Sequence, residues 1–171
     1  MKVTNLDRLN VKLDKLSKAD LSLAARRGIS FVQEEAKNLC PVKDGELRRS
    51  IHTDLLREPG KVTGICYTNK EYAGYVEFGT GPKGQEKHTG ISPEVTPVYV
   101  QKSWWIHESQ IERRTAEMYG WIHIDTPEGR FYQCSGQVAK PFMYPAISNN
   151  REIIEKIVAE YAREAIRRAI Q

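Results

Sequence analysis

Residues 149–170 constrain the fold more than any other part of the chain. Apolar side chains recur there at steps of three and four residues, and charged side chains fill most of the remaining positions. This period places the apolar residues on one face of a helix of about six turns, and such a face must pack against an apolar partner. Asn149 and Glu152 stand where an N-cap and its capping-box partner are expected. The apolar positions are Ile153, Ile154, Ile157, Val158, Tyr161, Ala162, Ala165, Ile166, Ala169 and Ile170.

A second long helix is predicted from about Ser17 to Leu39. Leu21, Ala25, Val32 and other apolar residues form one stripe along it. Ser17 and Asp20 resemble a capping box, and Pro41 ends the helix because the residue before a proline disfavours the helical conformation. For residues 6–16 the pattern leaves two options, a short separate helix or a mobile arm.

Two short alternating segments follow this helix. Residues 50–57 and 61–67 alternate in the manner of strands, and Glu58-Pro59-Gly60 is a turn sequence, so the pair predicts a β-hairpin. A short helix is expected over residues 71–78. The sequence therefore predicts an α+β fold, in which the long N-terminal helix and the C-terminal amphipathic helix pack on a small antiparallel sheet.

Residues 82–137 have the composition of an insertion into a single domain that spans residues 1–171. Residues 82–93 are rich in Gly, Pro, Lys and Ser and predict a flexible loop. We expect a strand over residues 95–101, a short polar helix over residues 108–118, and a second hairpin formed by residues 121–124 and 130–134.

The charge of the chain is weakly basic. The net charge is +4 and the isoelectric point is about 8.9. Basic and acidic residues alternate along both long helices, which is typical of solvated faces, whereas a DNA-binding surface needs its cations on one side. No run approaches the roughly 20 apolar residues of a membrane span. The first seven residues lack the apolar core of a secretory signal, so we expect a cytosolic product.

Reactive chemistry has little support in the sequence. Cys40, Cys66 and Cys134 are odd in number and far apart, and no cysteine or histidine pair has zinc-site spacing. Cys40 lies at a predicted helix C-terminus, where the helix dipole disfavours a thiolate. Residues 79–84 match G-x-G-x-x-G, but a helix precedes them and Pro82 lies within them, which argues against a dinucleotide site. We therefore predict no catalytic residue, metal ligand or cofactor.

Three segments together resemble a known family. They are Cys40–Ile51, Tyr72–Gly81 and Ala139–Ala146, the last followed directly by the amphipathic helix. In this order they resemble the neck or head–tail joining family of lambdoid-type tailed bacteriophages, whose members are often described as tail-component or minor capsid proteins. The resemblance covers the chain from about Leu21 to the end, except for much of the insertion. It implies a non-enzymatic virion protein that forms a homo-oligomeric ring.

A ring that closes needs two different complementary surfaces on each copy. Tyr72, Tyr75 and Phe78 recur at three-residue steps, and such an aromatic edge either packs on the hairpin or forms a subunit interface, where aromatic residues are enriched. Glu77 lies in the same run and could pair with an arginine of the next copy. The remaining candidate interface residues are Arg48 and Arg49, which alternatively are only solvated charges, and Trp104 and Trp105 in the insertion.

The resemblance also implies partners and a location. The partners are other copies of the chain, the head-closure or connector protein, and the tail terminator or tail tube protein. Genomic DNA would pass through the lumen without sequence-specific binding, and no membrane is involved. The protein would lie in the neck or tail of the virion after assembly in the host cytoplasm. Three alternatives remain open: a tail terminator, a DNA-binding morphogenesis factor, and a hydrolase that uses Cys40 or a metal.

Overall fold

A computed structural model describes residues 5–17 and 19–170, and its contacts divide the chain into two compact units. The first unit combines residues 1–70 with residues 142–171, and the second is residues 71–141. The insertion predicted at residues 82–137 lies within the second unit, which begins earlier and includes the Tyr72–Gly81 segment. Helices and small antiparallel sheets make up the chain, which confirms the predicted α+β class.

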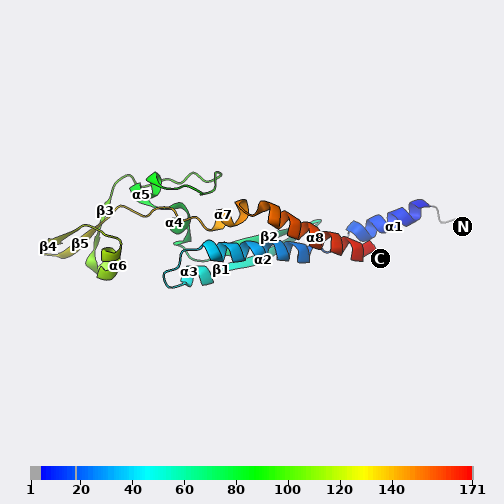
Figure 1. Ribbon diagram of the computed structural model, residues 1–171, viewed down its shortest axis with the longest axis horizontal. Coiled ribbons are helices and arrows are strands. Elements are labelled where there is room, and N and C mark those ends of the chain that lie inside the picture. The colour runs from blue at the N-terminus through cyan, green and yellow to red at the C-terminus, as the bar shows by residue number, and fades with distance from the viewer. Residues whose placement is uncertain (1–4, 18, 171) are drawn as a thin grey trace. The chain divides into compact units, whose positions relative to one another are not determined.

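The first unit is built around one helix. α2 (Ser22–Leu39) contacts α8 (Arg151–Ile170), α7 (Met143–Ser148) and both strands of the β1–β2 hairpin. Figure 1 shows α2 and α8 side by side along the hairpin. The strands β1 (Ile51–Glu58) and β2 (Lys61–Thr68) pair antiparallel from Ile51↔Thr68 to Glu58↔Lys61. The predicted hairpin is confirmed, and so is the packing of the C-terminal helix against the first long helix. α8 lies mainly on α2 rather than on the strands, and none of its residues is fully buried.

The core of the first unit lies where α2, the hairpin and α7 meet. Ile51, Phe142, Ala36 and Ala146 are completely buried there. Gly28 allows α2 to approach α8 closely, because a Cβ atom at this position would lie 2.6 Å from Cγ2 of Val158. The close crossing of these two helices therefore depends on a residue without a side chain.

The N-terminal boundary of the first long helix was predicted wrongly. Ser17 is the last residue of a separate helix, α1 (Asn5–Ser17), so it does not cap α2. The carboxylate of Asp20 accepts a hydrogen bond from the backbone N–H of Ser22 at 2.8 Å and satisfies one free donor at the start of α2. The first of the two options for residues 6–16, a separate helix, is the one that the structure shows.

The N-cap of α8 also lies one residue later than predicted. Asn149 closes α7, and α8 begins at Arg151. The carbonyl of Asn150 accepts the first helical hydrogen bond of α8, from the N–H of Ile154 at 2.9 Å. Asn150 is therefore the residue in the capping position.

The second unit holds a three-stranded antiparallel sheet in the order β3–β5–β4. β4 (His123–Thr126) and β5 (Gly129–Cys134) form the predicted hairpin, and β3 (Trp104–His107) pairs with the other edge of β5. The second unit also holds the helices α4 (Ala73–Phe78), α5 (Gly81–Glu86) and α6 (Arg113–Met118). The 3₁₀-helix η1 (Glu108–Gln110) forms the first part of the predicted polar helix. The remaining short helix, α3 (Glu46–Arg49), belongs to the first unit.

Two predictions within the second unit were wrong. Residues 95–101 form no strand, because Pro97 lacks the N–H that a sheet ladder needs, and Val98 is 98% exposed. Part of the predicted flexible loop is the helix α5, in which Pro82 occupies the first turn. A proline is favourable there because its fixed φ suits a helix start and its missing N–H is not needed.

Candidate subunit interface

Arg48 and Arg49 lie on α3 in the first unit, and both are exposed. The turn before α3 is fixed by Asp44, whose carboxylate accepts a hydrogen bond from the N–H of Glu46 at 2.9 Å. This bond is the main reason that the pKa of Asp44 lies below its ordinary value. Arg49 donates from Nη1 to the carbonyl of Asp44 at 3.2 Å, so its guanidinium lies against its own turn. The turn therefore holds the guanidinium of Arg49, and Arg48 is exposed next to it in the sequence.

The Tyr72–Gly81 segment exposes its aromatic side chains unequally. Tyr75 is 61% exposed and Tyr72 is 40% exposed, whereas Phe78 is half-buried. Glu77 is buried, with only 6% exposed. The pairing of Glu77 with another copy stays a prediction, and its burial makes Tyr75 the better position at which to test this surface.

Backbone hydrogen bonds fix this segment to residues 135–140 of the same unit. Thr80 and Gln137 form an antiparallel bridge, with N–H to carbonyl distances of 2.9 and 3.1 Å. The N–H of Lys140 donates to the carbonyl of Val76 at 2.8 Å, and the side-chain amide of Gln137 donates to the carbonyl of Tyr75 at 2.8 Å. The exposed tyrosines are thus carried on a backbone that is held along its length.

The two tryptophans of the candidate interface lie next to each other on β3. Trp104 is half-buried, and its ring is 3.0 Å from the position that a Cβ atom of Gly81 would take, so it belongs beside the Tyr72–Gly81 segment. Trp105 points to the opposite face of the strand, because side chains alternate, and is 44% exposed. The structure therefore brings Trp104 together with the aromatic segment and leaves Trp105 on another face of the sheet.

A hollow of about 420 Å³ next to Thr80 contains residues that the sequence did not single out. Tyr119 and Trp121 line it and stack with their ring centroids 5.9 Å apart. Lys83 and Lys140 line it as well. Exposed aromatic residues of this kind are enriched in protein interfaces. In the sequence, the Tyr119-Gly120-Trp121 triplet within a polar stretch was the feature that could have indicated this aromatic surface.

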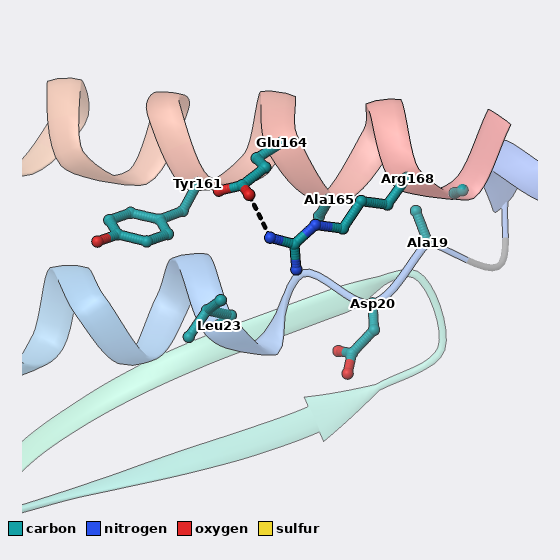
Figure 2. A pocket seen from close by; sticks show the side chains of 8 residues that line it. Ala19, Asp20, Leu23, Tyr161, Glu164, Ala165 and Arg168 are labelled. Carbon is teal, nitrogen blue, oxygen red and sulfur yellow. Dashed lines mark hydrogen bonds and ion pairs between the residues drawn. The ribbon is translucent and has the colours of Figure 1, made fainter. Parts of the chain in front are cut away.

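A second hollow of about 420 Å³ lies in the first unit, between the start of α2 and the end of α8. Figure 2 shows Leu23 and Tyr161 facing each other, with an ion pair between Glu164 and Arg168 on α8. Asp20 lines the same hollow, and its pKa is lowered because it accepts hydrogen bonds from Ser22. The charged groups of this hollow are engaged within the chain, and their arrangement offers no nucleophile with an adjacent base.

The cysteines show the properties of buried thiols. None of the three forms a disulfide, Cys40 and Cys134 are buried, and Cys66 is half-buried. Burial is the main cause that raises the pKa of the Cys66 and Cys134 thiols above the ordinary value. Among the described residues, no group of three His, Cys, Asp or Glu side chains could hold a metal ion.

These thiols should therefore react slowly in the folded protein. The thiolate is the reactive form, and a raised pKa lowers its fraction at any pH below that pKa. At pH 8 we expect iodoacetamide to modify Cys66 and Cys134 at least tenfold more slowly in native protein than in urea, by mass spectrometry of their peptides. Equal rates in the two conditions would contradict the burial of these side chains.

Comparison with known protein families gives a match over the first part of the chain. Residues 4–79 match the family model described as "Bacteriophage HK97-gp10, putative tail-component". No curated protein and no solved structure matches the chain. The matched region contains α2, the β1–β2 hairpin and two of the three segments that carry the resemblance, the second of them up to Gly79. In the described part of the chain, no helix is long and apolar enough to cross a membrane. Over residues 4–79 the chain is similar to this phage tail-component family, as its sequence predicted.

Proposed function

We propose that this protein is a non-enzymatic structural subunit of a homo-oligomeric ring in the neck of a tailed phage, where it joins the head connector to the tail. The observation that carries the proposal is the match of residues 4–79 to a phage tail-component family. The ring would meet a head-closure or connector protein on one side and a tail terminator or tail tube protein on the other. The packaged DNA would pass through its lumen.

Exposed aromatic side chains support self-association. Tyr75 and Tyr72 present large apolar rings to solvent from a segment whose backbone is fixed by hydrogen bonds. Rigid aromatic residues of this kind dominate the energy of protein interfaces, because they bury much area and lose little conformational entropy. We propose the Tyr72–Gly81 segment as one of the two unlike surfaces of the ring contact. Trp104 lies beside the Tyr72–Gly81 segment and belongs with that surface, whereas Arg48 and Arg49 of the first unit contribute to the other surface.

Replacing Tyr75 by alanine is expected to weaken ring formation at least tenfold and to leave the monomer folded. The side chain is 61% exposed, so its removal costs the fold little, whereas a central aromatic residue of an interface is worth about 2 kcal/mol or more. Native mass spectrometry over a concentration series measures the assembly, and circular dichroism measures the fold.

The matched control is Val98→Ala, which removes an even more exposed apolar side chain from the same unit. It should form rings at the concentration of the unmodified protein. Rings of unchanged stability with Tyr75→Ala would show that the interface lies elsewhere. An unmodified protein that stays monomeric at all concentrations would contradict the ring itself, and imaging of intact particles tests its place in the neck.

A further inference from the structure

α1 carries an exposed apolar stripe on one side. Leu6, Leu9, Leu13 and Leu16 recur at steps of three or four residues, and they are 67%, 51%, 54% and 38% exposed. At 100° per residue these four leucines fall within one quarter of the helix surface. A helix of 13 residues is marginally stable by itself in water, so such a stripe normally packs against another surface.

The first unit also has an open apolar groove. It has a volume of about 350 Å³ and runs between α2, β2, α7 and α8. Ala25 and Ile29 of α2, Val62 of β2, and Ile154 and Ala162 of α8 are among the residues that line it. Every described residue of its lining is Gly, Ala, Val, Leu or Ile, so the groove offers an apolar surface without a polar anchor.

The stripe and the groove match in length and in the charges beside them. Leu6 to Leu16 spans about 15 Å of helix, and the groove lining from Leu21, just before α2, to Val32 spans about 17 Å at 1.5 Å per residue. Arg8, Lys12 and Lys15 form a basic stripe next to the leucines on α1. On α8, Glu155 falls within about 20° of the groove residue Ala162 around the helix axis, so an acidic side chain stands at the margin of the apolar lining. A basic stripe beside the leucines and an acidic residue beside the groove are complementary in charge.

We propose that the leucine stripe of α1 from one copy of this chain occupies the α2–β2–α8 groove of another copy. This inference rests on the proposed ring and adds a second contact between the same two neighbours. The helix and the groove are different surfaces of one chain, so the contact is heterologous, which is the kind that closes rings. In a single copy the leucines are exposed and the groove is open. In the ring, the leucine stripe of one copy would fill the groove of the next copy, which buries both surfaces.

Leu13 and Val11 provide a matched pair of variants. They are 54% and 56% exposed on the same helix, but Val11 lies on the side away from the leucine stripe. Leu13→Asp is expected to raise the concentration needed for assembly at least tenfold, and Val11→Asp is expected to change it less than twofold. Sedimentation velocity over a concentration series measures both. Equal effects of the two substitutions would overturn the proposal.

Cross-linking between two separate variants shows whether the groove receives the helix of another copy. Leu13→Cys protein is mixed with Ala25→Cys protein under mild oxidation, and a covalent dimer is expected on a non-reducing gel. Mixing Val11→Cys protein with Ala25→Cys protein is the control and should give at least tenfold less dimer. A protein that carries both Leu13→Cys and Ala25→Cys is the third sample. If it cross-links within one chain while the mixture gives no covalent dimer, the helix occupies the groove of its own chain and the proposal is wrong.

The outcomes separate this inference from the proposed function. Rings of unchanged stability with Leu13→Asp would overturn the α1 contact and leave the ring in place. An unmodified protein that forms neither rings nor mixed cross-links would overturn both. Loss of rings with Leu13→Asp, together with mixed cross-links, is the result that supports the α1 contact.

Discussion

Replacing Phe142 by alanine is expected to lower the free energy of unfolding of the first unit by about 3–5 kcal/mol, because the side chain is completely buried and its removal leaves a cavity. All three tryptophans of the chain lie in the second unit, so far-UV circular dichroism, which follows the long helices α2 and α8, is the appropriate measurement. The urea midpoint from this signal should fall markedly.

Val42→Ala is the control for Phe142→Ala. Val42 lies in the same unit and is 61% exposed, so the substitution is expected to change stability by no more than about 0.5 kcal/mol. A loss below about 1 kcal/mol with Phe142→Ala would mean that the pocket around this ring is not the tightly packed core described above.

Replacing Gly136 by alanine is expected to destabilise the second unit by about 3–4 kcal/mol. Gly136 has a φ of +82°, and a Cβ atom would lie 1.9 Å from the carbonyl oxygen of Thr80. The left-handed backbone costs an alanine about 1–2 kcal/mol, and separating the Thr80–Gln137 bridge loses two hydrogen bonds of about 1 kcal/mol each. Tryptophan fluorescence during urea unfolding reports on this unit.

Gly120→Ala separates the two causes of that loss. Gly120 has a φ of +63° in the same unit, but a Cβ atom there would meet nothing within 4 Å. Its replacement should therefore cost only the backbone strain, about 1–2 kcal/mol. Equal losses of unfolding free energy with Gly136→Ala and Gly120→Ala would show that the contact with Thr80 does not contribute to the stability of the second unit. The exposed Tyr75 is carried by the segment that this bridge fixes, so Gly136→Ala should also weaken assembly.

The elements with a strong period could be predicted from the sequence. The stripe of α8, the end of α2 before Pro41 and the β1–β2 hairpin depend on local patterns, and the structure confirms all three. The start of α2 could not be found in this way, because two cap-like residues, Ser17 and Asp20, lie close together and only one of them bonds to the start of the helix.

The candidate interface was less accessible to sequence reasoning. The spacing of Tyr72 and Tyr75 left open whether these rings pack on the hairpin or face solvent, and their exposure is a finding of the structure. The burial of Glu77 and the bridge between Thr80 and Gln137 depend on residues far apart in the chain. Tyr119 and Trp121 share a hollow with Thr80 because β5 and the residues after it return to that segment. Contacts of this kind depend on tertiary packing, which periodicity does not encode.

The discontinuous first unit has a consequence for synthesis on the ribosome. Its central helix, α2, is made before the second unit, but Phe142 and α8, which complete the core around it, are made only after residues 71–141. Residues 71–141 are contiguous and can fold as soon as they emerge, since domains generally fold as units during translation. The hairpin can cover its side of α2 early, but the side of α2 that contacts α7 and α8 stays uncovered until residues 142–170 have been made, and the groove between α2 and α8 does not exist before then.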